Sequence, residues 1–332
     1  MDMLPEWKKI QTPGIDSMET VEIGGISQAL YFRGEDVKNP VILFLHGGPG
    51  YPEMPFLYGF QYPLEEHFTV AHWDQRNAGK TFFLNDHEAV VETLSFERVL
   101  ADAYEVTQYI RDKLQQHKII VMGHSWGTVL GTALVQAYPQ CFSAYVGVGQ
   151  AVNTHDNERV GFEALLEAAR AKGDVSDIQA IEALEPYPPL GAFGKDVIEK
   201  VWAVRMLQDK YGLATSGAGA EIISASPYYS QKEKEYFEVD IFKYHMPIFE
   251  FLFDKLDVRN FGTTFEIPVF IIMGERDYQT PHTLARDFFE EISAPYKAFF
   301  LVADAGHNTM HENKAEFNRI LIEEIKPMIR ES

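Results

Sequence analysis

The sequence predicts an α/β protein with a mostly parallel central sheet flanked by helices and a helical cap inserted late in the chain. Three short apolar runs, at residues 41–45, 118–122 and 267–273, have the length and composition of strands buried on both faces of a parallel sheet. Strands that alternate with helical patterns indicate βαβ units. The strand pattern stops between residues 151 and 262, and this interruption predicts the cap.

The remaining core elements follow from apolar spacing and from turn residues. Loose alternation over residues 19–33 predicts an antiparallel hairpin at a sheet edge, turned at Gly24–Gly25. Further strands are expected at 68–73, 142–148 and 297–302. The helical period predicts a helix over 96–116 with Ser95 as its N-cap. Other helices are expected at 53–67, 128–135, 281–292 and 312–330.

The cap is expected to be helical throughout. Its candidate helices are 158–171, 176–184, 195–211, 229–238 and 246–256, with a loop at Gly217–Gly219. Prolines at 186, 188 and 189 interrupt the helical pattern between the second and third helices. The predicted domains are therefore a core made of residues 1–150 and 263–332 and a cap made of residues 151–262.

Composition excludes several classes of protein. The 332 residues carry a formal net charge of -20, which argues against a nucleic-acid partner because phosphate binding requires a basic surface. A single cysteine, Cys141, rules out an intramolecular disulfide framework. The N-terminus has no apolar segment typical of a signal peptide, and no apolar run reaches the length of a membrane span. We therefore expect a cytoplasmic protein without a membrane or nucleic-acid partner.

The segment Gly123-His124-Ser125-Trp126-Gly127 carries the first catalytic signal. It lies between a predicted buried strand and a predicted helix, which is the context of a nucleophile elbow. In such an elbow the serine stands on a sharp turn at the N-terminus of the helix. A chance match to a short pattern is the alternative, and the flanking elements make it the weaker one. We identify Ser125 as the candidate nucleophile.

Two further side chains complete a candidate catalytic triad. A serine needs a neighbouring base and a third group that orients this base. Asp277 follows the predicted strand at 267–273, and His307 follows the one at 297–302. Their order after Ser125 matches the chain order Ser, Asp, His of this type of site. Asp304 and Glu275 are the alternative candidates for the acid.

A glycine-rich loop follows the strand at 41–45 and is the candidate oxyanion hole. The loop Gly47-Gly48-Pro49-Gly50 permits close approach of the backbone, and its N–H groups are suited to a tetrahedral oxyanion. We assign the two donors to the backbone N–H groups of Gly48 and Trp126, with Gly47 as the alternative to Gly48. A phosphate-binding loop is disfavoured, because neither GxGxxG nor a P-loop lysine is present.

Metal binding and cofactors are not expected. His307 and His311 have the spacing of two ligands on one helical turn, but no HExxH pattern accompanies them. The chemistry predicted from Ser125, Asp277 and His307 needs no cofactor.

Taken together, these motifs resemble the α/β-hydrolase superfamily and, more narrowly, the proline iminopeptidase group of serine peptidases. The resemblance rests on segments 46–50 (HGGPG), 74–81 (DQRNAGKT), 123–127 (GHSWG), 274–277 (GERD) and 306–307 (GH). It implies an α/β-hydrolase fold and release of an N-terminal residue, often proline, from short peptides. It also implies that acidic side chains of the cap hold the free amine of the substrate.

The sequence departs from this group at two places. Asn77 stands where the group has glycine, and the tryptophan–glutamate segment of the group's cap is missing around Trp202. No amine-binding residue is therefore assigned. The alternatives to an aminopeptidase are a carboxylic-ester or small-amide hydrolase and, from another class, a non-enzymatic small-molecule sensor that retains the triad.

Overall fold

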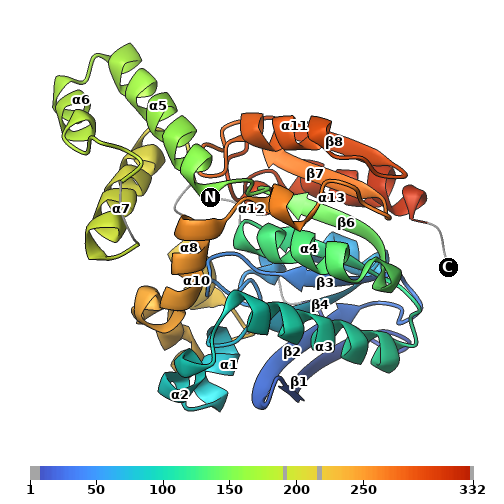
Figure 1. Cartoon of the computed structure of the whole chain (residues 1–332). Helices are drawn as coiled ribbons and strands as arrows, with labels where there is room; N and C mark the ends of the chain where they lie inside the picture. Colours follow the sequence, from blue (N-terminus) through green and yellow to red (C-terminus); the bar gives the residue numbers. More distant parts are fainter. Residues whose placement is uncertain (1–7, 190–192, 215–218, 330–332) are drawn as a thin grey trace.

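An eight-stranded sheet forms the centre of the protein (Figure 1). The computed structural model describes residues 8–189, 193–214 and 219–329. The strand order is β1-β2-β4-β3-β5-β6-β7-β8. β1 and β2 form an antiparallel hairpin at one edge, β2 is antiparallel to β4, and the pairings from β4 through β3 to β8 are parallel. The strands are β1 (Ile15–Ile23), β2 (Ile26–Gly34), β3 (Val41–Leu45), β4 (Thr69–Asp74), β5 (Ile119–His124), β6 (Phe142–Val148), β7 (Val269–Gly274) and β8 (Lys297–Val302).

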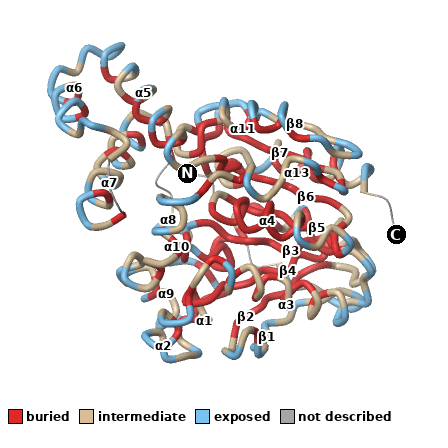
Figure 2. Tube along the Cα trace, in the orientation of Figure 1, coloured by how far each residue is buried: buried red, intermediate tan, exposed pale blue. Residues whose placement is uncertain are grey.

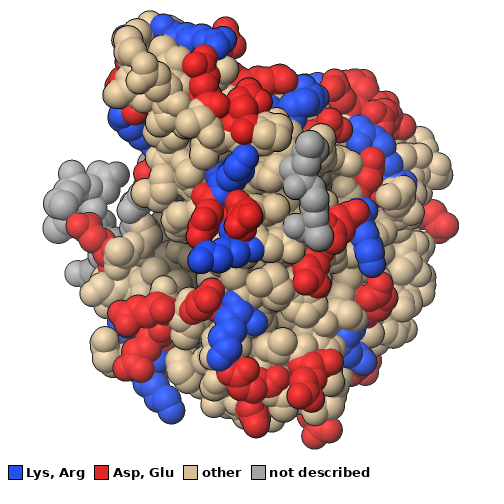
Figure 3. Space-filling view, turned by 60° about the vertical axis from the view of Figure 1, so that its left-hand side comes forward, with Lys and Arg blue, Asp and Glu red and all other residues tan. Residues whose placement is uncertain are grey.

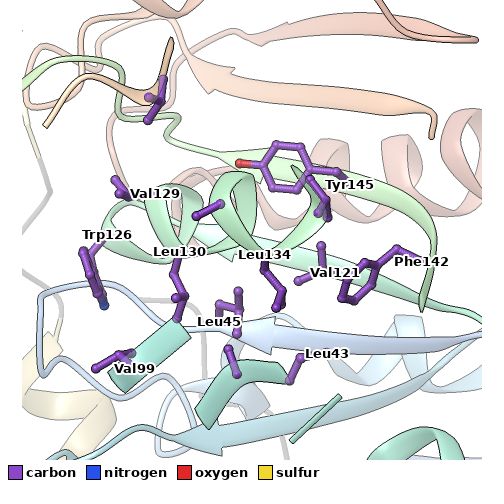
Figure 4. Close-up of a cluster of buried hydrophobic side chains, with 14 of the residues drawn as sticks. Leu43, Leu45, Val99, Val121, Trp126, Val129, Leu130, Leu134, Phe142 and Tyr145 are labelled. Carbon is purple, nitrogen blue, oxygen red and sulfur yellow. The ribbon is translucent and has the colours of Figure 1, made fainter. Parts of the chain in front are cut away.

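Helices cover both faces of the sheet and explain why its central strands are apolar. Alternate residues of each strand enter different clusters: Leu43 and Val121 lie on the face covered by α3 (Phe96–Leu114), α4 (Trp126–Ala137) and α11 (His282–Glu291). Figure 4 shows this packing under α4. Phe44 and Met122 lie on the opposite face, against the C-terminal helical segment. Burial is continuous through the inner strands β3, β4, β5 and β7 and through most of α4 (Figure 2), as expected of the centre of a parallel sheet.

Most predicted core elements are confirmed, and two predicted helices are wrong. Residues 53–67 form two 3₁₀ helices, η1 (Leu57–Gly59) and η2 (Tyr62–Glu66), in place of one helix. Pro63 would stand in the interior of that helix, where it lacks the N–H that the helix needs. The predicted helix 312–330 is divided into α12 (Thr309–Glu312), α13 (Lys314–Arg319), a π-helical segment (Ile320–Ile325) and a 3₁₀ turn (Lys326–Met328). Asn313 causes the first break, because its side chain caps α13.

Two short helices of the core were not predicted. α1 (Gly79–Leu84) and α2 (His87–Glu92) follow β4. Asp86 caps α2 by accepting hydrogen bonds from the N–H groups of Glu88 and Ala89. The described helices include none that is both long and apolar enough to cross a membrane.

The insertion, residues 151–262, is helical in its described part and contains no strand there. α5 (Thr154–Lys172), α6 (Val175–Glu182) and α7 (Lys195–Lys210) project from the sheet as an arm (Figure 1). The arm has its own small core around Phe162, Leu165 and Val204. α8 (Gly219–Ala225), α9 (Gln231–Lys234) and α10 (Ile241–Lys255) lie nearer the sheet, and Tyr228 and Tyr229 pack there with Tyr31 and Tyr58 of the core.

The boundaries within the insertion differ from those predicted at three places, the first being α5, which begins four residues before the predicted start at 158. The predicted helix 229–238 is α9 followed by a 3₁₀ turn, η4 (Glu235–Glu238), and α10 begins five residues before the predicted start at 246. α8 was not predicted; Gly219 begins it, while Gly217 and Ala218 of the predicted loop lie outside the described residues.

Positive and negative side chains are interspersed on the face shown in Figure 3. The described residues of that face therefore offer no continuous positive surface of the kind that a phosphate backbone requires.

Candidate active site

Ser125 occupies a strained turn between β5 and α4. Its backbone has φ 53° and ψ −118°, a region that non-glycine residues rarely adopt. The two glycines of the motif are required by close contacts: a Cβ on Gly123 would overlap the backbone of Gly127, and a Cβ on Gly127 would overlap the carbonyl of Leu45. The turn therefore has the geometry predicted for a nucleophile elbow.

Asp277 and His307 are brought together from the loops after β7 and β8. His307 Nδ1 lies 2.9 Å from Asp277 Oδ2, and both side chains are buried. The alternative acids Glu275 and Asp304 are exposed on the same loops, with 93% of the Asp304 side chain accessible. The structure thus pairs His307 with the acid that we favoured from the sequence.

The elbow and the His307 ring meet at the residues that follow β6. Ser125 N–H donates to the Val148 carbonyl at 3.0 Å, and a Cβ on the next residue, Gly149, would lie 3.1 Å from His307 Cε1. His307 Nε2 is buried and has no hydrogen-bond partner in the described part of the chain, Ser125 included. An imidazole nitrogen without a partner therefore lies beside the elbow.

The hydrogen bonds of Asp277 determine the tautomer of His307. A carboxylate only accepts, so the proton of His307 resides on Nδ1 and leaves Nε2 as an acceptor. Burial alone would raise the pKa of Asp277, but His307 and the donors of Thr280 outweigh burial and hold this pKa below its usual range. Asp277 is thus expected to be ionised at neutral pH.

Three residues that sequence analysis missed support His307. Thr280 Oγ donates to Asp277 Oδ2 at 2.9 Å, and His124 Nε2 lies 3.0 Å from the His307 carbonyl oxygen. The Glu312 carboxylate accepts the N–H groups of Gly306 and Asn308, which flank His307, at 2.7 and 3.1 Å. The sequence contains no pattern that predicts the contacts of Thr280 and His124. Glu312 could have been considered, because it lies close enough in sequence to reach back to the loop that carries His307.

The predicted oxyanion loop, Gly47–Gly50, lies against the elbow. A Cβ on Gly47 would be 3.4 Å from Ser125 Cβ, and Tyr51 N–H donates to the Gly47 carbonyl at 3.1 Å. Gly48 has φ 110°, which favours glycine. Neither the Gly48 N–H nor the Trp126 N–H has an acceptor among the described residues, so both remain available to a ligand.

Asn77 has a structural role at the position where the resembled group has glycine. Its φ of 60° lies in the left-handed region, which asparagine tolerates better than most residues. Its side-chain amide donates to the carbonyl of His87 at 3.0 Å and so connects the turn after β4 to α2. The substitution is therefore compatible with the turn.

His311 is not placed as a metal ligand beside His307. Its Nε2 lies 2.7 Å from Glu53 Oε1, and its ring packs against Phe60. The described residues contain no group of three or more His, Cys, Asp or Glu side chains that could hold a metal ion.

A small cavity lies between the arm and α10. Its volume is about 160 Å³, and its lining residues are His155, Glu158, Pro188, Pro189, Phe193, Val197 and Phe253. The cavity contains the buried carboxylate of Glu158. Both Glu158 oxygens already accept hydrogen bonds, one from the Arg205 guanidinium and the other from the Tyr187 hydroxyl.

The arm contacts the core next to Asp277, because Gln208 Nε2 donates to the Tyr278 carbonyl at 3.1 Å.

Asp74, at the end of β4, is buried where the core meets the insertion. Its Oδ2 accepts from the Tyr229 hydroxyl and, at 2.8 Å, from the Lys80 N–H, whereas Oδ1 has no partner in the described part of the chain. Burial raises the pKa of Asp74 to about 7 despite these donors. The neutral acid is therefore favoured in the folded chain below neutral pH.

Replacing Asp74 with asparagine is expected to change how stability depends on pH. The carboxyl ionises near pH 3.8 when unfolded but keeps its proton to about pH 7 when folded, so its ionisation lowers the native chain's free energy of unfolding across this interval. Asparagine carries no such penalty. Urea unfolding should measure the free energy of unfolding of Asp74→Asn minus that of the native chain. This difference should rise by a few kcal/mol from about pH 4 to 7 and stay constant above pH 7.

The exposed Asp304→Asn replacement provides the control for this measurement, since its carboxyl is in water in both states. A stability difference for Asp74→Asn that does not vary with pH would show that Asp74 ionises as readily in the folded chain as in the unfolded one.

Comparison with known proteins agrees with this architecture. The family model described as alpha/beta hydrolase fold matches residues 40–314. The chain is 27% identical to "Probable aminopeptidase YbaC" of Bacillus subtilis (strain 168) over 330 residues, which is 96% of this chain and 98% of that protein.

Solved structures show the same fold. A proline iminopeptidase-related protein from Thermus thermophilus has a TM-score of 0.66 at 18% identity and covers 95% of this chain and 99% of its own. Epoxide hydrolase VrEH1 from Vigna radiata has a TM-score of 0.58 at 17% identity, with 94% and 98% covered. Because the family model spans residues 40–314 of 332, this chain belongs to the α/β-hydrolase fold family.

Proposed function

We propose that this protein is a serine hydrolase that works through an acyl-enzyme, with Ser125 as nucleophile, His307 as base and Asp277 as the group that orients the base. One observation carries the proposal. Asp277 accepts a hydrogen bond from His307 Nδ1, which leaves His307 Nε2 as an acceptor. This nitrogen is buried beside the elbow of Ser125 and has no hydrogen-bond partner among the described residues. A nitrogen in this state is suited to take the proton of a serine hydroxyl.

The steps follow from these groups. His307 Nε2 takes the proton of Ser125 Oγ as this oxygen attacks the carbonyl carbon of the substrate. The Gly48 and Trp126 N–H groups donate to the resulting oxyanion. His307 then gives the proton to the leaving amine or alcohol, and the acyl-enzyme forms. Water, deprotonated by His307, then attacks the acyl carbon of this ester. The bond from this carbon to Ser125 Oγ breaks, His307 returns the proton to Oγ, and the acid is released.

The substrate class that we favour is a short peptide or amino-acid amide with a free N-terminus, as for an aminopeptidase of the proline iminopeptidase type. Support comes from the similarity to the probable aminopeptidase of Bacillus subtilis along nearly the whole chain and from the HGGPG and DQR segments.

A carboxylic-ester or small-amide hydrolase is the second candidate. The cavity carboxylate Glu158 is already compensated by Arg205, which makes it a poor partner for a substrate amine. An epoxide hydrolase is disfavoured, because those members of the fold use an aspartate nucleophile and this elbow carries Ser125.

A substrate panel separates these two candidates. We expect proline, alanine or leucine arylamides with a free amine to react at least about tenfold faster, in kcat/KM, than the same arylamides blocked at nitrogen, because a charged contact is worth about 1.5–3 kcal/mol. p-Nitrophenyl esters of simple acids serve as the comparison. Equal rates for free and blocked arylamides would remove the aminopeptidase and favour the ester or small-amide hydrolase.

A further inference from the structure

Two residues of the insertion enclose the end of the oxyanion loop. Tyr236, in the turn η4, is only 3% exposed, and its hydroxyl donates to the Gly50 carbonyl at 2.7 Å. The Asn77 carbonyl lies 3.1 Å from the same hydroxyl, so one proton is shared between the oxyanion loop and the turn after β4. The His245 ring of α10 also lies against Gly50, because a Cβ on this glycine would lie 2.7 Å from both ring nitrogens.

Gly48 and Gly50 lie close together in the same turn. A Cβ on Gly48 would lie 2.6 Å from the backbone nitrogens of Gly50 and Tyr51, so the turn is folded tightly on itself. The bond from Tyr51 N–H to the Gly47 carbonyl closes this turn. A shift of the Gly50 peptide would therefore also reorient the Gly48 N–H.

We propose that Tyr236 is a positioning residue, which holds the oxyanion loop so that the Gly48 N–H faces the oxyanion. The inference rests on the proposed function, since it assigns a role within the same site. The insertion would then have two roles. It is expected to select the substrate, and through Tyr236 it would also position the oxyanion loop of the core.

The Tyr236 hydroxyl is suited to this role because it remains a donor. Burial raises the pKa of Tyr236 well above its ordinary value, and the neighbouring Asp74 carboxylate raises it further. The hydroxyl is therefore protonated throughout the pH range of a neutral hydrolase, and the bond to the Gly50 carbonyl does not titrate there.

The test is Tyr236→Phe, which removes the hydroxyl and keeps the ring. The control is Tyr58→Phe: the Tyr58 hydroxyl also donates at 2.7 Å to a backbone carbonyl across the boundary between core and insertion, that of Ile222, but it does not touch the oxyanion loop. We expect Tyr236→Phe to lower kcat about tenfold and to change KM less than about threefold, because oxyanion stabilisation acts in the transition state. Tyr58→Phe should keep kcat within about twofold.

A boronic acid gives a readout that a purely structural role would not move. It forms a tetrahedral adduct with a nucleophilic serine, and one oxygen of the adduct occupies the oxyanion hole. Its inhibition constant should rise about tenfold in Tyr236→Phe and stay unchanged in Tyr58→Phe, while the Tm of both variants falls by a similar amount. His245→Ala, which removes the second contact with Gly50, should weaken the boronic acid in the same direction and serves as the test if Tyr236→Phe does not fold.

The outcomes separate this inference from the proposed function. Equal kcat and equal boronic-acid inhibition for Tyr236→Phe and Tyr58→Phe would overturn the positioning role and leave a working hydrolase. A native chain that neither turns over any substrate of the panel nor binds a boronic acid would overturn the serine-hydrolase proposal itself.

Discussion

Ser125→Ala is expected to lower kcat by roughly 10⁴–10⁶, the range for removal of a triad nucleophile. The replacement deletes only Oγ, and no hydrogen bond to Oγ occurs in the described part of the chain. The backbone bonds of this residue, from Ser125 N–H to the Val148 carbonyl and from Thr128 to the Ser125 carbonyl, do not involve the side chain. The fold should therefore persist, with an unchanged circular dichroism spectrum and a Tm close to that of the native chain.

Labelling by a fluorophosphonate probe reports on the same residue without a known substrate. The native chain should be labelled and Ser125→Ala should not. Ser226→Ala, which replaces a buried serine of the insertion, is the control and should be labelled like the native chain. A loss of kcat below about tenfold in Ser125→Ala would remove the assignment, and an unlabelled, inactive native chain would favour the sensor.

The core strands could be predicted from sequence because burial on both faces imposes a composition. The run at 41–45 became β3 with the predicted bounds, and all five residues are buried. Each of the two predicted helices failed where a single residue overrode the apolar period: Pro63 interrupted the segment at 53–67, and a side-chain cap at Asn313 divided the last helix. Apolar spacing identifies a buried face but does not show where the backbone hydrogen bonds are interrupted.

The sequence predicts those residues of the candidate site whose positions follow from the topology of the sheet. Carboxyl ends of parallel strands lie at one edge of a sheet, and this rule alone brings the residues after β5, β7 and β8 together. Tyr236 and Thr280 could not be found in this way. Their roles depend on which backbone carbonyl or carboxylate the folded chain presents to a hydroxyl, and for Tyr236 that partner is 186 positions away in the sequence.

Asp277→Asn is expected to lower kcat by about 10⁴ by reversing the tautomer of His307. The Asp277 Oδ1 atom accepts two backbone N–H groups, those of Gln279 at 3.0 Å and Thr280 at 2.9 Å. An asparagine keeps both bonds only if its carbonyl oxygen occupies the Oδ1 position, which directs its NH₂ group at His307 Nδ1. The imidazole must then accept at Nδ1 and carry its proton on Nε2, where it cannot take the proton of Ser125.

The opposite amide orientation is disfavoured by the same two donors. It would oppose the NH₂ group to both backbone N–H groups in a buried site, at a cost of about 1–3 kcal/mol for each unsatisfied group. Fluorophosphonate labelling of Asp277→Asn should therefore slow by a factor similar to that for kcat, with Ser125 still present. Asp304→Asn, at the exposed alternative acid, should keep kcat within about twofold. If Asp304→Asn caused the large loss and Asp277→Asn did not, the acid of this triad would be Asp304.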